Sequence, residues 1–331
     1  MTLEPATRVD SVPPSGIRRF FELAEEMDDI ISLGVGEPDF SAPWAAREAA
    51  IASLERGQTS YTANRGKREL RERIADYEAA THGLQYDPDE EILVTAGASE
   101  GLDLAFRALL NPGDTVAIAQ PCYVSYVPGA TFAGVDVVDV PTRAEDEFKL
   151  TRDVLESAGA ADADALVYCY PNNPTGATMT GDEIAEVAAF CRENDLVVFA
   201  DEIYADLTYE HDHTSIASLP GMRERTVVFN GFSKAFAMTG FRLGYAMAPP
   251  EAIEAMNRIH QYSMLSAPTT AQHAAIEALD NCRDEVTDMA AQYDRRRKYV
   301  LTRFEEMGLD CFPAAGAFYA FPECPWDDAG E

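Results

Sequence analysis

The chain has 331 residues, 47% of them hydrophobic and 25% charged, which is enough apolar material for one large domain or two smaller ones. Fifty-seven acidic residues against 26 basic ones give a formal net charge of −31, and a field of this sign repels nucleic acids and anionic membranes. No apolar run approaches the ~20 residues of a membrane-spanning helix, and the first residues carry no basic patch or apolar signal segment. We therefore expect a cytoplasmic protein without nucleic-acid or membrane partners.

Lysine is scarce among the basic residues. Only Lys67, Lys149, Lys234 and Lys298 are lysines, and the other basic residues are arginines. An acidic excess with few lysines is typical of a halophilic protein, whose self-repulsion is screened by concentrated salt. An ordinary acidic protein is the alternative. The scarcity also makes each remaining lysine more informative about function.

Short apolar runs alternate with amphipathic stretches from about residue 90 onward, a pattern typical of an α/β sheet. The expected strands are Ile92–Thr95, Val116–Ala119, Val135–Val140, Ala165–Tyr170, Leu196–Ala200, Val227–Phe229 and Leu243–Ala246. The expected helices are Ser99–Leu110, Asp182–Glu193, 251–262 and 283–307.

The two ends of the chain lie outside this alternation. We expect residues 1–33 to be the N-terminal segment of a small domain, residues 34–285 to form a large domain, and residues 286–331 to begin the C-terminal part of the small domain.

The first candidate site follows the first predicted strand. Open α/β sheets bind ligands beyond the carboxyl ends of their strands, and here Gly97, Ala98 and Ser99 open a helix. Small residues let backbone N–H groups approach an anion, which the helix N-terminus also favours. This is a candidate phosphate site, although a plain strand–helix turn has the same appearance.

Two further loops place polar or aromatic groups at strand ends. Tyr123 follows the second strand, and the run Pro171-Asn172-Asn173-Pro174-Thr175-Gly176 follows the fourth. Prolines make such a loop rigid, so that an asparagine amide is presented in a set orientation. Taken alone, this loop is better explained as a well-made turn.

The most informative residues follow the fifth and sixth strands. Asp201 ends an apolar strand, where a carboxylate is costly unless it has a partner. Lys234 follows Ser233 between Phe232 and Phe236, and an apolar setting lowers the pKa of an ammonium group and frees a nucleophilic amine. Arg242, eight residues on, offers a forked donor suited to phosphate.

A metal site is not expected. The six cysteines contain no C-x-x-C pair, so zinc-site spacing is absent and reduced thiols are expected. His211-x-His213 lies in a polar stretch and is interpreted as an exposed loop.

The motifs taken together resemble a known family. Asn173-Pro174-Thr175-Gly176, Asp201-x-x-Tyr204, Ser233-Lys234 and Gly240-x-Arg242 resemble those of the fold-type-I enzymes that depend on pyridoxal 5'-phosphate (PLP), in particular the class I/II aminotransferases of the aspartate and aromatic type. The resemblance begins at Pro14-Ser15-Gly16-Ile17-Arg18, includes Gly36-Glu37-Pro38-Asp39-Phe40 and Tyr61-x-x-x-Arg65-Gly66, and extends to Gly316-Ala317-Phe318-Tyr319. It implies a large domain with a mainly parallel mixed sheet flanked by helices, plus a smaller α/β domain.

The resemblance also implies a role for each motif residue. Lys234 would hold PLP as a Schiff base and then move the substrate's Cα proton. Asp201 would keep the pyridine nitrogen protonated, and Tyr204 and Asn173 would hydrogen-bond the ring hydroxyl. Tyr123 would stack on the ring and, with Gly36 and Asn173, contact the substrate. The phosphate would be held by Gly97, Ala98, Ser99, Ser233, Arg242 and, from the neighbouring subunit of a homodimer, Tyr61.

The function implied is transfer of an amino group between an L-amino acid and a 2-oxo acid. The alternatives are another PLP reaction on the same scaffold, such as β-elimination, a non-catalytic PLP-binding regulator, or a plain α/β domain. The substrate is not readable. The Gly97–Ser99 loop holds no lysine or arginine to pair a side-chain carboxylate, which disfavours strict aspartate specificity, whereas Phe20, Phe21, Tyr61 and Tyr126 are candidates to line an aromatic or aliphatic pocket.

One expected residue is missing from this sequence. The family binds the substrate α-carboxylate with an arginine several tens of residues beyond the Gly-Ala-Phe-Tyr motif, and the sequence stops at Glu331. We expect the natural protein to continue past Glu331 and to carry that arginine there.

Overall fold

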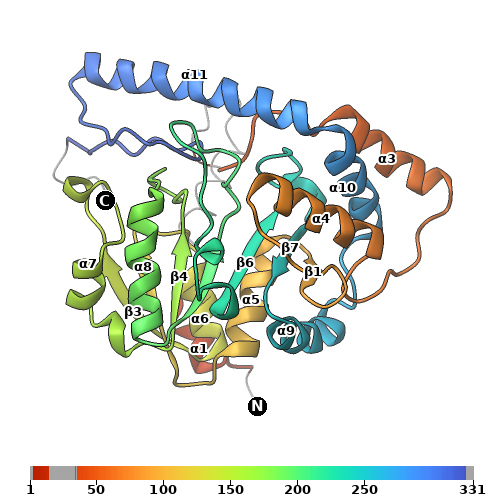
Figure 1. Cartoon of the computed structure of the whole chain (residues 1–331), viewed down its shortest axis with the longest axis horizontal. Coiled ribbons are helices and arrows are strands. Elements are labelled where there is room, and N and C mark those ends of the chain that lie inside the picture. The colour runs from red at the N-terminus through yellow and green to blue at the C-terminus, as the bar shows by residue number, and fades with distance from the viewer. Residues whose placement is uncertain (1–2, 15–33, 35, 326–331) are drawn as a thin grey trace.

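A seven-stranded mixed sheet forms the centre of the molecule (Figure 1). The structure is a computed structural model that describes residues 3–14, 34 and 36–325. The strand order is β1-β7-β6-β5-β4-β2-β3, and β7 runs antiparallel to both of its neighbours while the other pairs are parallel. The predicted mainly parallel, mixed sheet is confirmed.

All seven predicted strands are confirmed, with ends that differ by no more than two residues. Their bounds are β1 Ile92–Thr95, β2 Thr115–Gln120, β3 Asp136–Pro141, β4 Ala165–Cys169, β5 Val197–Asp201, β6 Thr226–Gly231 and β7 Gly244–Met247. Strands β4 and β6 are buried along their whole length, as expected of central strands covered on both faces.

Helices cover both faces of this sheet (Figure 1). Their bounds are α1 Thr7–Asp10, α3 Trp44–Glu55, α4 Arg68–Thr81, α5 Ala98–Leu109, α6 Tyr126–Ala133, α7 Arg152–Ser157, α8 Gly181–Glu193, α9 Pro250–Ser263, α10 Thr269–Asn281 and α11 Arg283–Met307. The four predicted helices correspond to α5, α8, α9 and α11 and are confirmed. Helix α8 begins at a capping box, in which the Thr180 side chain accepts from the Glu183 backbone N–H and the Glu183 carboxylate accepts from Thr180.

The alternation of side chains along each strand creates two cores. In β5, Val198 and Ala200 belong to the cluster that also contains residues of α4, α8 and α10, whereas Phe199 belongs to the opposite cluster with α5, α6 and α9. Because strand side chains alternate between faces, Asp201 shares the face of Phe199 and points towards α5 and α6. The side chain of Glu202, one residue on, turns the other way.

The carboxyl ends of the parallel strands meet at one edge of the sheet. The loops after β1, β2, β4 and β6 and the last residue of β5 all lie there, at the edge where open α/β sheets bind their ligands. Strand β7 is antiparallel, so its start, just after Arg242, lies at the same edge. Six segments far apart in sequence are thus brought to one place.

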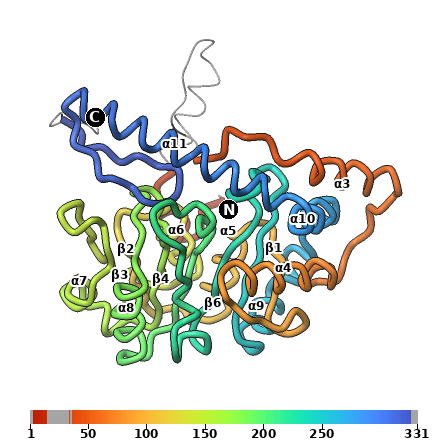
Figure 2. The backbone as a smooth tube through the Cα atoms, turned by 45° about the horizontal axis from the view of Figure 1, so that its top comes forward, coloured from red at the N-terminus to blue at the C-terminus, as the bar shows by residue number. Residues whose placement is uncertain are grey.

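The long helix α11 crosses above this edge, and residues 308–325 fold back along it (Figures 1 and 2). Tyr293 of α11, Ala317 of the returning segment and Ile203, Tyr204 and Leu207 form one buried cluster. The backbone N–H groups of Gly316 and Ala317 bond the carbonyls of Gly176 and Leu207. The segment that follows α11 therefore closes over the carboxyl edge.

In the described part of the chain, no helix is both long enough and apolar enough to cross a membrane.

Candidate active site

A cavity of about 700 Å³ opens at the carboxyl edge of the sheet. Most of the predicted site residues line it: Gly36, Ala98, Ser99, Tyr123, Asn173, Asp201, Tyr204, Ser233, Lys234 and Arg242. Gly97 lies directly behind the rim, because a Cβ built on it would be 2.7 Å from Arg242 Nη2. Of the predicted site residues, Gly97 and Tyr61 do not line this cavity: Gly97 lies next to it, and Tyr61 lies at another place on the chain.

The loop between β1 and α5 is shaped by glycine. Gly97 has φ 81°, a backbone conformation that L-residues avoid, and it turns the chain so that α5 begins with Ala98 at the cavity. On the other side of the loop, a Cβ on Gly244 would be 2.5 Å from Ala98 N. The two glycines let strand β7 and Arg242 approach the first N–H groups of the helix.

Hydrogen bonds of the Glu100 side chain support the same loop. Glu100 of α5 accepts from Ala96 N at 2.5 Å with one carboxylate oxygen and lies 2.7 Å from His260 Nδ1 of α9 with the other. His260 is completely buried. Sequence reasoning missed this pair, since nothing in the local pattern indicates that residues 160 positions apart meet.

Asp201 is buried at the floor of the cavity. Its pKa is raised by burial, and the raise is opposed by a 2.7 Å hydrogen bond that Tyr126 Oη donates to Oδ2 and by the charge of Lys234. The carboxylate also accepts from Ile203 N. Tyr126, which was expected as a candidate lining residue for a substrate side chain, does line the cavity. It is 1% exposed, and its hydroxyl also orients Asp201.

Lys234 lies in the same cavity, and its side chain is partly buried. Burial lowers the pKa of Lys234 to about 8, although Asp201 and Glu37 act in the opposite sense. Its Nζ donates to the Gly36 carbonyl oxygen at 2.5 Å and lies 5.6 Å and 5.5 Å from the ring centres of Tyr204 and Phe318. The side chain of Lys234 thus lies between aromatic rings, with Asp201, Glu37 and Arg242 close enough to act on its charge.

Tyr204 meets a tyrosine from the other end of the chain. The hydroxyl oxygens of Tyr204 and Tyr319 are 2.5 Å apart, and burial raises the pKa of both phenols, that of Tyr319 to about 12. Tyr319 was recognised only as part of the Gly-Ala-Phe-Tyr motif, without a role.

The second asparagine of the proline-rich loop faces the cavity and the first does not. Asn172 is buried and its Oδ1 accepts from Thr175 Oγ1 at 2.8 Å, which holds the turn. Asn173 is thereby left to line the cavity. Tyr123 lies at the cavity wall, edge-on to Tyr126 with ring centres 5.5 Å apart.

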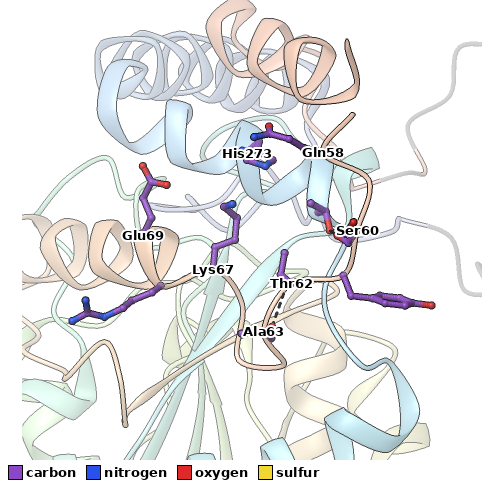
Figure 3. Close-up of a pocket in the computed structure, with 10 residues that line it drawn as sticks. Gln58, Ser60, Thr62, Ala63, Lys67, Glu69 and His273 are labelled. Carbon is purple, nitrogen blue, oxygen red and sulfur yellow. Dashed lines mark hydrogen bonds between the residues drawn. The ribbon is translucent and has the colours of Figure 1, made fainter. Parts of the chain in front are cut away.

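Tyr61 lies elsewhere, beside a surface hollow of about 590 Å³ (Figure 3). Its side chain is 80% exposed. The hollow is lined by polar residues that include Ser60, Lys67 and His273 (Figure 3). Tyr61 therefore does not reach the cavity that contains Lys234 of the same chain. Phe20 and Phe21, and Pro14-Ser15-Gly16-Ile17-Arg18 apart from Pro14, lie outside the described residues.

The interpretation of His211-x-His213 as an exposed loop is wrong for His213. The His213 side chain is 8% exposed and its Nε2 lies 3.1 Å from Glu202, which also accepts from Ser215 at 2.7 Å. The reason is that the Glu202 side chain points to the face of the sheet opposite Asp201 and is buried there. A buried carboxylate is costly without a hydrogen-bonding partner. Within residues 3–14, 34 and 36–325, no group of three or more His, Cys, Asp or Glu side chains has the arrangement of a metal site.

Comparison with known proteins identifies the family. The model of the family "Aminotransferase class I and II" matches residues 28–329. The chain belongs to the class I and II aminotransferases. It is 51% identical to the putative aminotransferase YugH of Bacillus subtilis, over 97% of this chain and 83% of that protein. It is 44% identical to an aspartate aminotransferase of Pyrococcus abyssi, over 95% and 82%.

Solved structures of class I and II aminotransferases have the same fold. The crystal structure of an aromatic aminotransferase from Pyrococcus horikoshii matches with a TM-score of 0.86 and 44% identity, covering 93% of this chain and 82% of that one. The fold-type-I architecture is therefore confirmed, and the chain is a nitrogen-group transferase of this family.

Proposed function

We propose that this aminotransferase holds PLP on Lys234 and moves an amino group between an L-amino acid and a 2-oxo acid. The observation that carries the proposal is the meeting, in one cavity, of an amine whose pKa is lowered to about 8 with the buried carboxylate of Asp201. The first is suited to attack a carbonyl, and the second is suited to hold a proton on a ring nitrogen.

The residues present fit a phosphorylated aromatic cofactor. Ala98 and Ser99 at the start of α5 and Arg242 line the cavity together. A Cβ on Gly97 would meet the Arg242 guanidinium, and one on Gly244 would meet the backbone of Gly97 and Ala98, so both glycines are needed for this approach. This is an anion cradle of backbone N–H groups and a forked cation. Asp201, Lys234 and Tyr123 line the same cavity.

PLP supplies an aldehyde that condenses with amines and a ring that delocalises the electrons of a broken Cα–H bond. In this proposal the chain does the remaining work. Asp201, oriented by Tyr126, holds a proton at the ring nitrogen, and Lys234 Nζ takes and returns the proton of the substrate Cα.

The other predicted residues bind and orient. Tyr204 and Asn173 donate hydrogen bonds to the ring hydroxyl oxygen, and Tyr123 covers one ring face. Gly97, Ala98, Ser99, Ser233 and Arg242 bind the phosphate. Gly36 lies beside Lys234 and is placed to contact the substrate. Each of these roles belongs to the proposal.

The proposed phosphate site is completed by a homodimer in which the two subunits share their active sites. Tyr61 is 80% exposed and outside its own chain's cavity, which is the expected position of a residue that reaches the phosphate of a neighbouring subunit.

We also propose a halophilic environment, supported by the net charge of −31 and the four lysines. The division into segments 1–33, 34–285 and 286–331 stays a prediction.

A half-reaction screen tests the proposed function. The PLP-loaded protein is mixed with single amino acids, and conversion of the PLP absorbance to that of the pyridoxamine form is followed without any oxo acid. We expect conversion with a subset of L-amino acids and its reversal by the matching 2-oxo acids. Release of ammonia without formation of the pyridoxamine form would instead favour a β-elimination enzyme. Since the named relatives include both aspartate and aromatic aminotransferases, both classes belong in the screen.

A further inference from the structure

We propose that Tyr319 is a positioning residue for Tyr204: its hydroxyl holds the Tyr204 hydroxyl in place and strengthens the hydrogen bond that Tyr204 donates to the cofactor ring. This inference rests on the proposed function and assigns a role to the Gly-Ala-Phe-Tyr motif that the proposed function leaves without one.

The first argument is the position of the Tyr319 hydroxyl. It is 2.5 Å from Tyr204 Oη, and a Cβ built on Gly36 would come within 2.4 Å of it. Gly36 is also the residue whose carbonyl accepts from Lys234. The hydroxyl of Tyr319 therefore lies between the main chain beside Lys234 and the phenol of Tyr204.

The second argument is that this position is held firmly. The backbone N–H of Gly316 bonds Gly176 O, and that of Ala317 bonds Leu207 O. The ring of Phe318 lies edge-on to Tyr204 at 5.5 Å and packs on Tyr293 of α11 at 5.3 Å. A Cβ on Gly316 would be 2.6 Å from Pro171, so the motif needs its glycine to approach the sheet edge.

The third argument comes from the donors and acceptors of two phenols. Each hydroxyl has one O–H to donate and lone pairs to accept. Both phenols stay protonated at neutral pH, because burial raises the pKa of each. If Tyr204 donates its only proton to the cofactor ring oxygen, its bond to Tyr319 must run the other way, with Tyr319 as the donor. A hydroxyl that accepts one hydrogen bond donates a stronger one.

This arrangement predicts a property of the bound cofactor. A donor to the ring oxygen stabilises negative charge there and lowers the proton affinity of the nitrogen that links Lys234 to the cofactor. Removing the Tyr319 hydroxyl weakens that donor. The pH at which the absorbance of the bound cofactor changes should therefore rise.

The test is an absorbance titration of the PLP-loaded full chain, with Tyr319→Phe against wild type. We expect the midpoint to rise by about half to one pH unit, the size expected of one neutral hydrogen bond. The fall in kcat should exceed any change in KM. Tyr293→Phe is the matched control, because Tyr293 belongs to the same buried cluster and no hydrogen bond joins its hydroxyl to Tyr204 or Tyr319. Its titration should equal that of wild type.

A double-mutant cycle shows whether Tyr319 acts through Tyr204. In a Tyr204→Phe background, Tyr319→Phe should shift the midpoint by less than about 0.2 unit, since the residue through which it acts is gone. An unchanged midpoint in Tyr319→Phe alone, or equal shifts in both backgrounds, would overturn the inference. If wild type forms no borohydride-reducible link at Lys234, the proposed function fails and the inference falls with it; a normal link with an unshifted midpoint overturns the inference only.

Discussion

Lys234 and Asp201 share one cavity. Burial shifts the pKa of each group in the direction that favours its uncharged form. The pKa of Lys234 is lowered to about 8 and that of Asp201 is raised, while their mutual attraction opposes both changes. A neutral amine is the reactive form towards an aldehyde. The protein thus maintains near neutral pH a nucleophile that an ordinary lysine provides only in strongly basic solution.

This shift predicts the pH dependence of cofactor capture. Because the pKa of Lys234 is lowered, the neutral fraction of its amine grows as pH rises through about 8. The rate at which the apo-protein captures PLP should therefore increase between pH 7 and 9 and level off above. Stopped-flow absorbance measures it. A rate that keeps climbing past pH 10, as for a free lysine of pKa ~10.4, would show that burial does not prepare this amine.

Asp201→Asn tests the role of the buried carboxylate. An amide cannot hold a positive charge on a ring nitrogen, and removing one partner of a buried charged pair costs ~3 kcal/mol or more. We expect PLP to remain bound and kcat to fall about a hundredfold or further, with a smaller change in KM. Steady-state kinetics measure both. Asp212→Asn, on an exposed loop nearby, is the control, and comparable activity in the two variants would refute the assigned role.

At the scale of the elements, the close approach of β7 to the start of α5 forms the anion cradle. Gly244→Ala places a methyl group 2.5 Å from Ala98 N and 2.7 Å from Gly97 C. Overpacking of this kind costs ~1–3 kcal/mol, so the dissociation constant for PLP should rise about tenfold, measured by fluorescence titration. Gly240→Ala is the matched control, because a Cβ at Gly240 meets nothing within 4 Å. Equal affinities in the two variants would remove this loop from the phosphate site.

The capping box of α8 provides a stability test away from the cavity. Thr180→Ala removes the side chain that accepts from Glu183 N and should lower the free energy of unfolding by ~1 kcal/mol. Denaturant unfolding measures this loss. Thr287→Ala, at an exposed position near the start of α11, should change the stability little, because alanine is the better helix former. A neutral Thr180→Ala would show that α8 does not depend on its cap.

The elements differ in how readily the sequence predicted them. Strands such as β4 and β5 are apolar along nearly their whole length and are followed by turn residues, so their positions were readable. Helix α10 was not predicted. It is buried through alanines, such as Ala271, Ala274 and Ala278, which contrast weakly with their polar neighbours and make a faint amphipathic pattern. Helices α3 and α4 precede the regular alternation and were missed for lack of a neighbouring strand.

The site was predictable where one residue follows one strand, and less so where two distant segments meet. Lys234, Asp201 and Arg242 each lie next to an apolar run. The contacts of Tyr126 with Asp201, of His260 with Glu100 and of Tyr319 with Tyr204 join segments that are 75, 160 and 115 residues apart. No local pattern encodes such pairs, and they depend on strand order and helix packing.

For the whole molecule, the net charge of −31 predicts a dependence on salt. The Debye length falls from ~10 Å at 0.1 M to ~3 Å at 1 M, which relieves repulsion between neighbouring carboxylates. Thermal stability and activity should therefore rise as the salt concentration increases into the molar range. Melting curves in KCl measure the first. Maximum stability in dilute buffer would remove the halophilic interpretation and leave the proposed site unchanged, and the cytoplasmic location stays a prediction.

The central claim is that Lys234 holds the cofactor, and the position of the covalent link tests it most directly. Lys149 and Lys298 pair with carboxylates, and Lys67 lines the surface hollow of Figure 3. We would incubate the chain with PLP, reduce it with borohydride, and locate the modified peptide by mass spectrometry. The prediction is a single adduct on Lys234, absent from a folded Lys234→Ala variant. An adduct on Lys67, Lys149 or Lys298 in its place would contradict the account.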